Sequence, residues 1–177
     1  MGKNKLKAEL GLGDAEAQDV IDAYEQKVPF VKQLTLQVSQ RAQDSGRIRT
    51  LLGRLCRFPL WEPSYFGIHK PLKHKEALAE HGPGIRRAFT YKALNKLIQG
   101  SAADMIKKAM INLHKEKIVP LIQIHDELNI SVESKEQSER IIEIMEQAVK
   151  LKVPNKVDYE VGEHWGSIQE DISDEED

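Results

Sequence analysis

Several features that would place a protein outside the cell or in a membrane are missing from this sequence. Cys56 is its only cysteine, which excludes an intramolecular disulfide and argues against a cysteine-based zinc site. No stretch approaches the roughly 20 apolar residues that cross a bilayer. The amino-terminal residues also lack the apolar core of a secretory signal. We therefore expect a soluble, cytoplasmic protein without membrane contact.

The net charge of −2 conceals an uneven distribution. All 26 Lys and Arg lie before residue 157, whereas nine of the 28 acids lie in residues 158–177. The body through Val157 therefore carries +7 and the last 20 residues carry −9. A basic body suits a surface that binds phosphates, although solubility charge followed by a disordered acidic end would explain the same distribution.

Apolar spacing predicts several helices. A short one lies within Leu6–Leu12, and Asp14 is expected to cap the next, over Ala15–Lys27, with a buried stripe of Val20, Ile21 and Tyr24. The remaining predicted helices run from Pro29 to Ala42, from Arg86 to Lys115 and from a capping box at Ser134–Gln137 to about Leu151.

Short apolar runs predict strands between these helices. They are a hairpin or a strand with a tight bend in Ile48–Phe58, a pair at Ile118–Ile124 and Leu128–Val132, and a last strand at Val157–Val161. Pro59–Gly84 reads as a loop-dominated excursion. Residues from Asp171 onward are expected to be disordered. The fold class is thus α+β, with long helices packed on a small antiparallel sheet.

Three polar residues, His125, Asp126 and Glu127, fall at the junction of the two central strands. A hairpin would hold them rigidly at its tip, where a carboxylate suits a hard cation such as Mg²⁺. The alternative is a polar turn without chemistry, because Asp is common in turns.

A second polar group lies on the longest predicted helix. Tyr91, Asn95 and Gln99 are four residues apart, so they share one face, and Lys96 is among the cations around them. Amide side chains can address the acceptors that every base pair presents in the minor groove. A solvated helix face is the alternative.

The sequence resembles the family A (DNA polymerase I-like) DNA polymerases. The run N-x-x-I-Q-G-S-A-A-D-M-I-K-x-A-M at 95–110 is followed at 123–128 by Q-x-H-D-E-L, which is similar to the family's motif C. Weaker likeness includes T-L-L-G-R at 50–54, E-A-Q at 16–18 and G-x-x-W-G at 162–166. The resemblance covers nearly the whole chain.

The resemblance implies a partial polymerase whose parts divide into four ranges. Residues 1–46 would be the helical part of the fingers, 47–84 the hairpin and loop excursion, 85–170 the palm with motif C, and 171–177 the acidic tail. The host would be a bacterial or phage-infected cell.

The resemblance also implies a two-metal phosphoryl transfer. Asp126 would bind Mg²⁺ with a second aspartate, Glu127 would assist, and His125 would lie against the primer terminus. Residues that would contact primer–template DNA are Asn95, Gln99, Tyr91, Arg54 and Lys96. Deoxynucleoside triphosphates would be the second substrate.

Departures from the family pattern bear on this interpretation. Motif A and the helix ending in Y-G, which holds the nucleotide, lie upstream of anything in this sequence. Tyr91 stands where many relatives have Arg, and Leu97 replaces the usual Pro, which should leave the helix straighter. Either the chain is a split-gene subunit whose partner chain supplies the missing motifs, or it is a truncated product, and in both cases we expect the isolated chain to be inactive. The alternatives are a non-catalytic DNA-binding subunit and a structural remnant.

Overall fold

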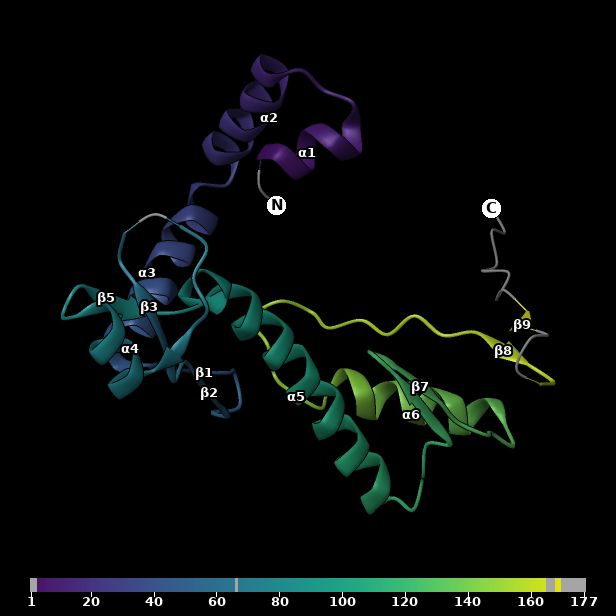
Figure 1. Ribbon diagram of the computed structural model, residues 1–177. Coiled ribbons are helices and arrows are strands. Elements are labelled where there is room, and N and C mark those ends of the chain that lie inside the picture. Colours follow the sequence, from purple (N-terminus) through teal and green to yellow (C-terminus); the bar gives the residue numbers. More distant parts are fainter. Residues whose placement is uncertain (1–2, 66, 165–167, 170–177) are drawn as a thin grey trace. The chain divides into compact units, whose positions relative to one another are not determined.

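The computed structural model describes residues 3–65, 67–164 and 168–169 (Figure 1). The chain forms two compact units, residues 1–101 and 102–177, whose boundary falls within helix α5. The first unit contains α1 (Lys3–Leu10), α2 (Asp14–Lys27), α3 (Pro29–Ser45), β1 (Arg47–Arg49), β2 (Leu55–Arg57), β3 (Leu60–Pro63), β4 (Leu72–Lys73), α4 (His74–His81), β5 (Ile85–Arg87) and the 3₁₀ helix η1 (Thr90–Lys92). Helix α5 (Ala93–Lys115) continues into the second unit, which adds β6 (Ile122–Ile124), β7 (Glu127–Asn129), α6 (Lys135–Glu146), β8 (Val161–Gly162) and β9 (Ile168–Gln169).

The mixture of helices and small antiparallel sheets confirms the predicted α+β class. Helix α5 runs without a break through Leu97, as expected from the missing proline. No helix in the described part of the chain is long and apolar enough to span a membrane.

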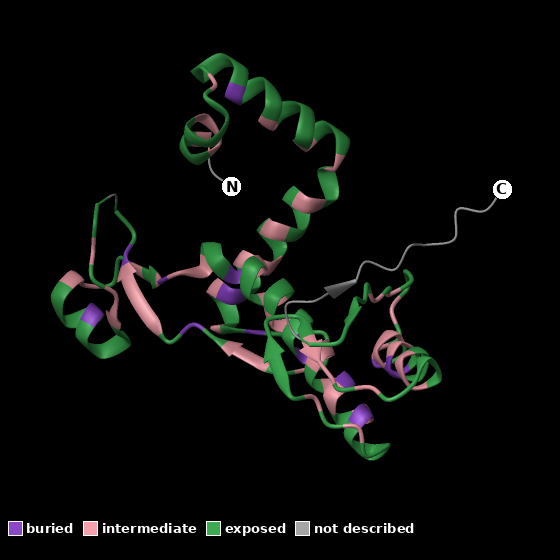
Figure 2. Ribbon diagram, turned by 90° about the vertical axis from the view of Figure 1, so that its right-hand side faces the viewer, coloured by how far each residue is buried: buried purple, intermediate pink, exposed green. Residues whose placement is uncertain are grey.

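The first two long helices of the chain are largely exposed (Figure 2). Within α2 only Ala17 is buried, whereas Val20 and Tyr24 are 45% and 55% exposed. The prediction of a buried stripe on this helix is therefore wrong, because α2 packs mainly against α1 and α3 and no larger element covers its apolar face. The predicted cap is also displaced by one residue, since Gly13 is the N-cap and donates its backbone N–H to Glu16 Oε2 at 2.8 Å.

The predicted hairpin at 48–58 is confirmed. Strands β1 and β2 pair antiparallel with Ile48 opposite Cys56. Ile48 and Phe58 are buried with Ala42 of α3 and Ala93 of α5, and these four residues form the core of the first unit. This core fixes the hairpin against the two helices.

The segment 59–84 is not the loop-dominated excursion that the sequence suggested. Strand β3 pairs with β4 on one side and with β5 on the other, and the intervening α4 buries Ala77. Trp61 pairs with Arg87, so the stretch predicted as the start of one helix from Arg86 is a strand and a turn before α5 begins. These pairings are non-local, and strands of two to four residues leave too short a pattern to be read from the sequence.

Arg87 connects these elements of the first unit. Its guanidinium donates to the carbonyl of Gln43 through Nε (3.0 Å) and to that of Phe58 through Nη1 (3.2 Å). It also lies 4.5 Å from the centroid of the Trp61 ring. Gly46 has a left-handed φ of 68°, and a Cβ there would lie 2.6 Å from Arg87 Cζ. The end of α3 is thus shaped to admit this side chain.

The second unit is built around Leu113 of α5 and Ile141 and Ile144 of α6. Ser134 caps α6 as predicted, accepting a hydrogen bond from the backbone N–H of Gln137 at 3.2 Å. The helix ends at Glu146 rather than near Leu151, because the N–H of Ala148 turns back to Met145 O (3.2 Å) and closes a tighter turn.

The end of the chain also differs from the prediction. Residues 157–160 are not in a strand, and the short β8 begins at Val161 and pairs with β9. The segment from Asp171 onward lies outside the described residues.

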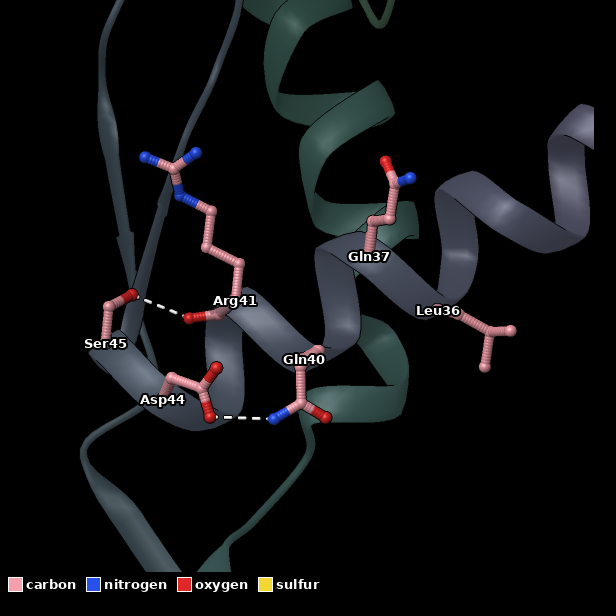
Figure 3. A pocket seen from close by; sticks show the side chains of 6 residues that line it. All are labelled: Leu36, Gln37, Gln40, Arg41, Asp44 and Ser45. Atoms are coloured by element: carbon pink, nitrogen blue, oxygen red, sulfur yellow. Dashed lines mark hydrogen bonds between the residues drawn. The ribbon is translucent and has the colours of Figure 1, made fainter.

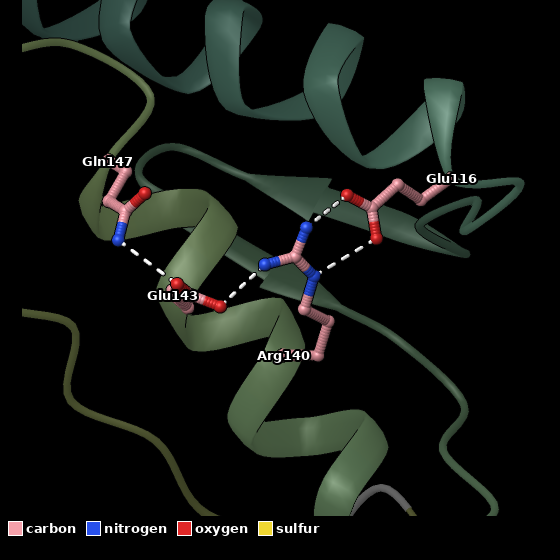
Figure 4. A network of polar contacts seen from close by, with 4 residues as sticks. All are labelled: Glu116, Arg140, Glu143 and Gln147. Carbon is pink, nitrogen blue, oxygen red and sulfur yellow. Dashed lines mark hydrogen bonds and ion pairs between the residues drawn. The ribbon is translucent and has the colours of Figure 1, made fainter.

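An arginine of α6 connects this helix to the residue after α5 (Figure 4). Arg140 donates to both carboxylate oxygens of Glu116 (2.5 and 3.1 Å) and to Glu143 (2.5 Å). The hydrogen bonds from Arg140 hold the pKa of Glu116 below its ordinary value, and the two glutamates raise the pKa of the guanidinium. The pair is exposed, so solvent screens it.

We predict that Arg87→Lys destabilises the first unit by roughly 1–3 kcal/mol, because an ammonium cannot keep both carbonyl bonds and the ring contact. The matched control is Arg86→Lys, since Arg86 is exposed and pairs with Glu62. Denaturant unfolding of the two variants measures the difference. Equal unfolding midpoints for both would show that the Arg87 contacts are dispensable.

A second prediction concerns acid. Glu116 has a lowered pKa in the folded state, so its stabilisation is present above the pKa of the unfolded chain and is lost as pH falls through the lower folded value. Arg140→Gln should raise the Glu116 pKa towards its ordinary range and weaken the fall in stability below about pH 4.5. Carboxyl NMR titration measures this, and Lys156→Gln serves as the control. An unchanged Glu116 titration in Arg140→Gln would refute the assignment.

Candidate metal-binding hairpin and nucleic-acid surface

The central hairpin places His125 and Asp126 in a two-residue loop. Ile124 pairs with Glu127 as the last register step of β6 and β7, so the loop is as short as a hairpin allows. The strands are shorter than predicted, and Ile122 and Ile124 are 41% and 38% exposed rather than buried. The anchoring comes instead from Leu128 and its neighbours in 128–132, which pack on the core of the second unit.

His125 adopts a strained backbone conformation in this loop. Its φ is 51°, in the left-handed region where non-glycine residues are uncommon. Such a residue costs on the order of 1 kcal/mol or more and persists only where its surroundings require it. The Gln123 side chain supports the turn by donating to the His125 carbonyl at 3.1 Å.

Two adjacent carboxylates lie at this tip. Asp126 and Glu127 are both exposed, and Glu127 Oε1 accepts a hydrogen bond from Asn129 Nδ2 at 3.0 Å. Within the described residues no side chain donates to the Asp126 carboxylate. Exposed carboxylate oxygens are suitable donors for Mg²⁺. However, the described residues contain no group of three or more His, Cys, Asp or Glu that could hold a metal, so the donor set fits part of a site.

A groove of about 970 Å³ adjoins the tip within the second unit. Asp126 and Glu127 contribute to its wall, together with apolar side chains of α5 and α6 such as Met105, Ile106 and Met145. The carboxylates thus lie at the edge of a concavity lined by both apolar and polar side chains.

The predicted DNA-contact residues all belong to the first unit. Asn95 and Gln99 are exposed and lie one turn apart on α5, as the spacing predicted. Tyr91 is 69% exposed but belongs to η1, so it does not continue their line on the helix. Phe89 has a left-handed φ of 63° immediately before η1, which shows why the helix starts later than expected.

Two predicted contact cations make specific local contacts. Lys96 Nζ lies 4.9 Å from the centroid of the Phe58 ring. Arg54 Nη2 donates to the carbonyl of Gly100 at 2.7 Å, which brings the guanidinium beside Gln99. Arg54, Gln99 and Lys96 therefore lie around one stretch of α5. The residues of the 125–127 turn belong to the other unit.

Sequence reasoning missed a close approach at Gly100. A Cβ there would lie 2.9 Å from Thr50 Cγ2 and 3.4 Å from Arg54 Nη2, so only glycine admits the turn after β1 to this depth. Ser101 Oγ accepts a hydrogen bond from the backbone N–H of Leu51 at 2.9 Å. The sequence did contain an indication of this contact, because a glycine inside a helical pattern commonly marks a position where another group packs closely.

A further hollow lies on the exposed surface of α3 (Figure 3). Its volume is about 720 Å³ and all six lining residues come from this one helix, in the range 36–45. The side-chain amide of Gln40 donates a hydrogen bond to Asp44 Oδ1 at 2.7 Å. With no second element contributing groups, it is a helix surface rather than a converging site.

Comparison with known proteins identifies relatives of this chain. The model of the DNA polymerase family A matches residues 1–167. A DNA-directed DNA polymerase of Pseudomonas phage M6 is 36% identical over 151 residues, covering 85% of this chain and 20% of that protein. DNA polymerase I of Bacillus caldotenax is 37% identical over 171 residues, covering 90% of this chain and 17% of that protein. The chain thus spans about a fifth of the length of these curated relatives.

A solved structure matches as well. The POL domain of Pol1 from M. smegmatis, in complex with DNA primer-template and dNTP, is 30% identical with a TM-score of 0.64, covering 86% of this chain and 26% of that one. The fold is therefore that of part of a polymerase domain. The chain belongs to DNA polymerase family A.

We predict that Gly100→Ala destabilises the first unit, because Thr50 cannot turn away while its Oγ1 accepts the Arg54 N–H at 3.0 Å. The clash should cost about 1–3 kcal/mol, offset by the roughly 1 kcal/mol that alanine gains inside a helix. Thr50→Ser removes the clashing methyl and keeps the hydroxyl.

A double-mutant cycle in denaturant separates these effects. In the Thr50→Ser background, Gly100→Ala should be neutral or stabilising. Gly84→Ala is the control, since a Cβ there meets nothing within 4 Å. The same loss from Gly100→Ala with and without the Thr50 methyl would mean that the contact is not limiting.

Proposed function

We propose that this chain is the carboxy-terminal portion of a DNA-directed DNA polymerase, acting in DNA replication. The observation that carries the proposal is the Asp126 carboxylate in a two-residue hairpin loop, within a family A sequence. The fold of a polymerase domain supports it. The cytoplasm of a bacterial or phage-infected cell stays a prediction for its location.

In this proposal Asp126 is the motif C metal ligand and Glu127 assists beside it. Bound Mg²⁺ would supply the charge that stabilises a pentavalent phosphoryl transition state. The exposed carboxylate of Asp126 would be the oxygen ligand at the loop tip, and the Asn129 amide orients Glu127 by a hydrogen bond. The rigid turn positions His125 next to both carboxylates, where the ring would contact the primer terminus.

Primer–template DNA and deoxynucleoside triphosphates are the proposed substrates. Asn95 and Gln99 present amide donors and acceptors from one exposed helix face, which suits sequence-independent minor-groove contacts. Arg54 and Lys96 lie around the same stretch of α5, and exposed Tyr91 lies just before it. These residues would hold the duplex while the chemistry proceeds at motif C.

The second metal-binding aspartate and the nucleotide-binding helix would come from outside this sequence, either on a partner chain or in another part of a longer polypeptide. The described residues contain no three-residue metal group, which agrees with a site completed elsewhere. A second candidate function is a non-catalytic DNA-binding subunit that is inactive without such a partner. Exposed apolar residues of the first unit, such as Val20 and Tyr24, are available for that partner.

Primer extension tests the proposal. The isolated chain should not extend a primer, and mixing it with a polypeptide that carries motif A and the nucleotide-binding helix should restore Mg²⁺-dependent extension. Asp126→Asn should then lower the rate by about 100-fold or more, because it removes an anionic ligand worth several kcal/mol. DNA binding should stay close to that of the unaltered chain.

Glu139→Gln is the matched control, since it removes an exposed carboxylate of the same unit on α6. A reconstituted rate within a few-fold of the unaltered chain in Asp126→Asn would refute the metal-ligand role. Extension by the purified chain without a partner, abolished by Asp126→Asn, would refute the need for a partner. DNA binding by the mixed chains without primer extension would favour the non-catalytic subunit.

A further inference from the structure

The hairpin of the first unit concentrates positive charge. Residues 41–57 contain five arginines and one acid, Asp44. The amide of Gln40 already engages the Asp44 carboxylate at 2.7 Å. The hairpin itself, residues 47–57, has four of these arginines and no acid. A short segment that carries charge of only one sign attracts ligands of opposite charge.

The strand register brings two of these arginines face to face. Arg47 of β1 pairs directly with Arg57 of β2, so both side chains leave the same face of the hairpin. Arg49 shares that face, because side chains repeat every second residue. All three arginines are exposed, whereas Ile48 points the other way and is 4% exposed in the core. We call Arg47, Arg49 and Arg57 the arginine face.

The arginine face does not stabilise the fold. Like charges directly opposite each other in a sheet are destabilising. Among the described residues, no carboxylate forms an ion pair with a member of the arginine face, and the one hydrogen bond from their side chains runs from Arg49 Nη1 to the Gly53 carbonyl at 2.7 Å. Arg87 shows the contrast, since its guanidinium is engaged by two carbonyls and a ring. The arginine face therefore keeps free donors at a cost to stability.

We infer that the arginine face is a second nucleic-acid contact, which binds the phosphodiester backbone of DNA. Guanidinium groups bind phosphate oxygens through two parallel donors. Arg47 and Arg49 are about 6.8 Å apart along their strand, and a DNA strand carries one phosphate per roughly 3.4 Å of axial rise. Because 6.8 Å is about two such rises, the two arginines span an axial distance that covers more than one phosphate of a strand.

This inference rests on the proposed function only in taking DNA as the polyanion, and it uses residues outside the matched motifs. Contacts to phosphates position a duplex without reading its sequence. The arginine face would therefore add affinity and register to the contacts proposed for Asn95 and Gln99.

Salt-dependent binding tests the inference on the full chain. Fluorescence anisotropy with a labelled primer–template duplex, over roughly 50–200 mM salt, gives the log–log slope. Arg47→Gln/Arg57→Gln should reduce the slope by about 1.8, because each phosphate contact contributes about 0.9. Across that fourfold salt range, the unaltered chain should then lose about 12-fold more affinity than the variant.

Thermal unfolding of the same variant supplies a second readout. Removing the opposed charges should leave the melting temperature unchanged or raise it, so weaker binding cannot come from unfolding. Arg57→Glu should likewise stabilise the hairpin by creating an opposite-charge pair, and should weaken binding further. A lower melting temperature in both variants would assign the arginines a structural role and overturn the inference.

Matched variants separate this face from net charge and from the proposed function. Lys5→Gln/Lys32→Gln removes two cations that already pair with Glu9 and Glu25, and it should leave the slope nearly unchanged. An equal loss of slope in that control would reduce the effect to net charge and overturn the inference.

Ligand arms complete the design. A single-stranded oligonucleotide of equal length and inorganic phosphate serve as competitors. Displacement of the duplex by inorganic phosphate at concentrations comparable to DNA phosphate would identify a small-anion site instead.

If the unaltered chain binds with a steep slope that Arg47→Gln/Arg57→Gln does not change, the inference fails while the proposed function stands. If Asn95→Ala/Gln99→Ala leaves affinity intact and the arginine variant reduces it, the contacts proposed for α5 fail and the inference stands.

Discussion

The close approach of the 50–54 turn to helix α5 is the constraint on which the first unit depends. Gly100 leaves room for the Thr50 methyl, Ser101 accepts the Leu51 N–H, and Arg54 donates back to the Gly100 carbonyl. Two segments that resemble family motifs are therefore parts of one contact. This contact holds the hairpin that carries Arg54 against the helix that carries Asn95, Lys96 and Gln99.

A second constraint shows that positive charge does not by itself indicate a phosphate ligand. Arg87 belongs to the basic group seen in the sequence, yet carbonyls of Gln43 and Phe58 and the Trp61 ring take up its guanidinium. Arg54 is in an intermediate position, since one of its nitrogens is used by Gly100. Among the described residues, Arg47 and Arg57 of the β1–β2 hairpin have no such acceptor for their side chains, and Arg49 has one, the Gly53 carbonyl. Counting cations in the sequence could not make this distinction, because it depends on which backbone carbonyls a fold brings within reach.

The sequence predicted those parts of the fold and site that depend on local patterns. The cap at Ser134, the start of α3 at Pro29 and the β1–β2 and β6–β7 hairpins follow from spacing and turn chemistry. The pairing of Trp61 with Arg87 could not be predicted, because it joins segments separated by α4. For the site, the 123–128 motif located the turn, but the left-handed backbone of His125 and the depth of the Gly100 contact exist only in three dimensions.

Two of the unfavourable features of this structure lie in the β1–β2 and β6–β7 hairpins. His125 holds a left-handed conformation in one, and Arg47 opposes Arg57 in the other. Each hairpin has strands of only three residues, so neither is stable by itself in water. The cores beside them must then provide the stability, through Ile48 and Phe58 in the first unit and Leu128 against Leu113 in the second. Strain and opposed charges persist where neighbouring packing offsets them. Left-handed φ values also occur at Phe89 and Lys117, but the strained turn and the opposed arginines lie at places where this chain is proposed to touch metal and DNA.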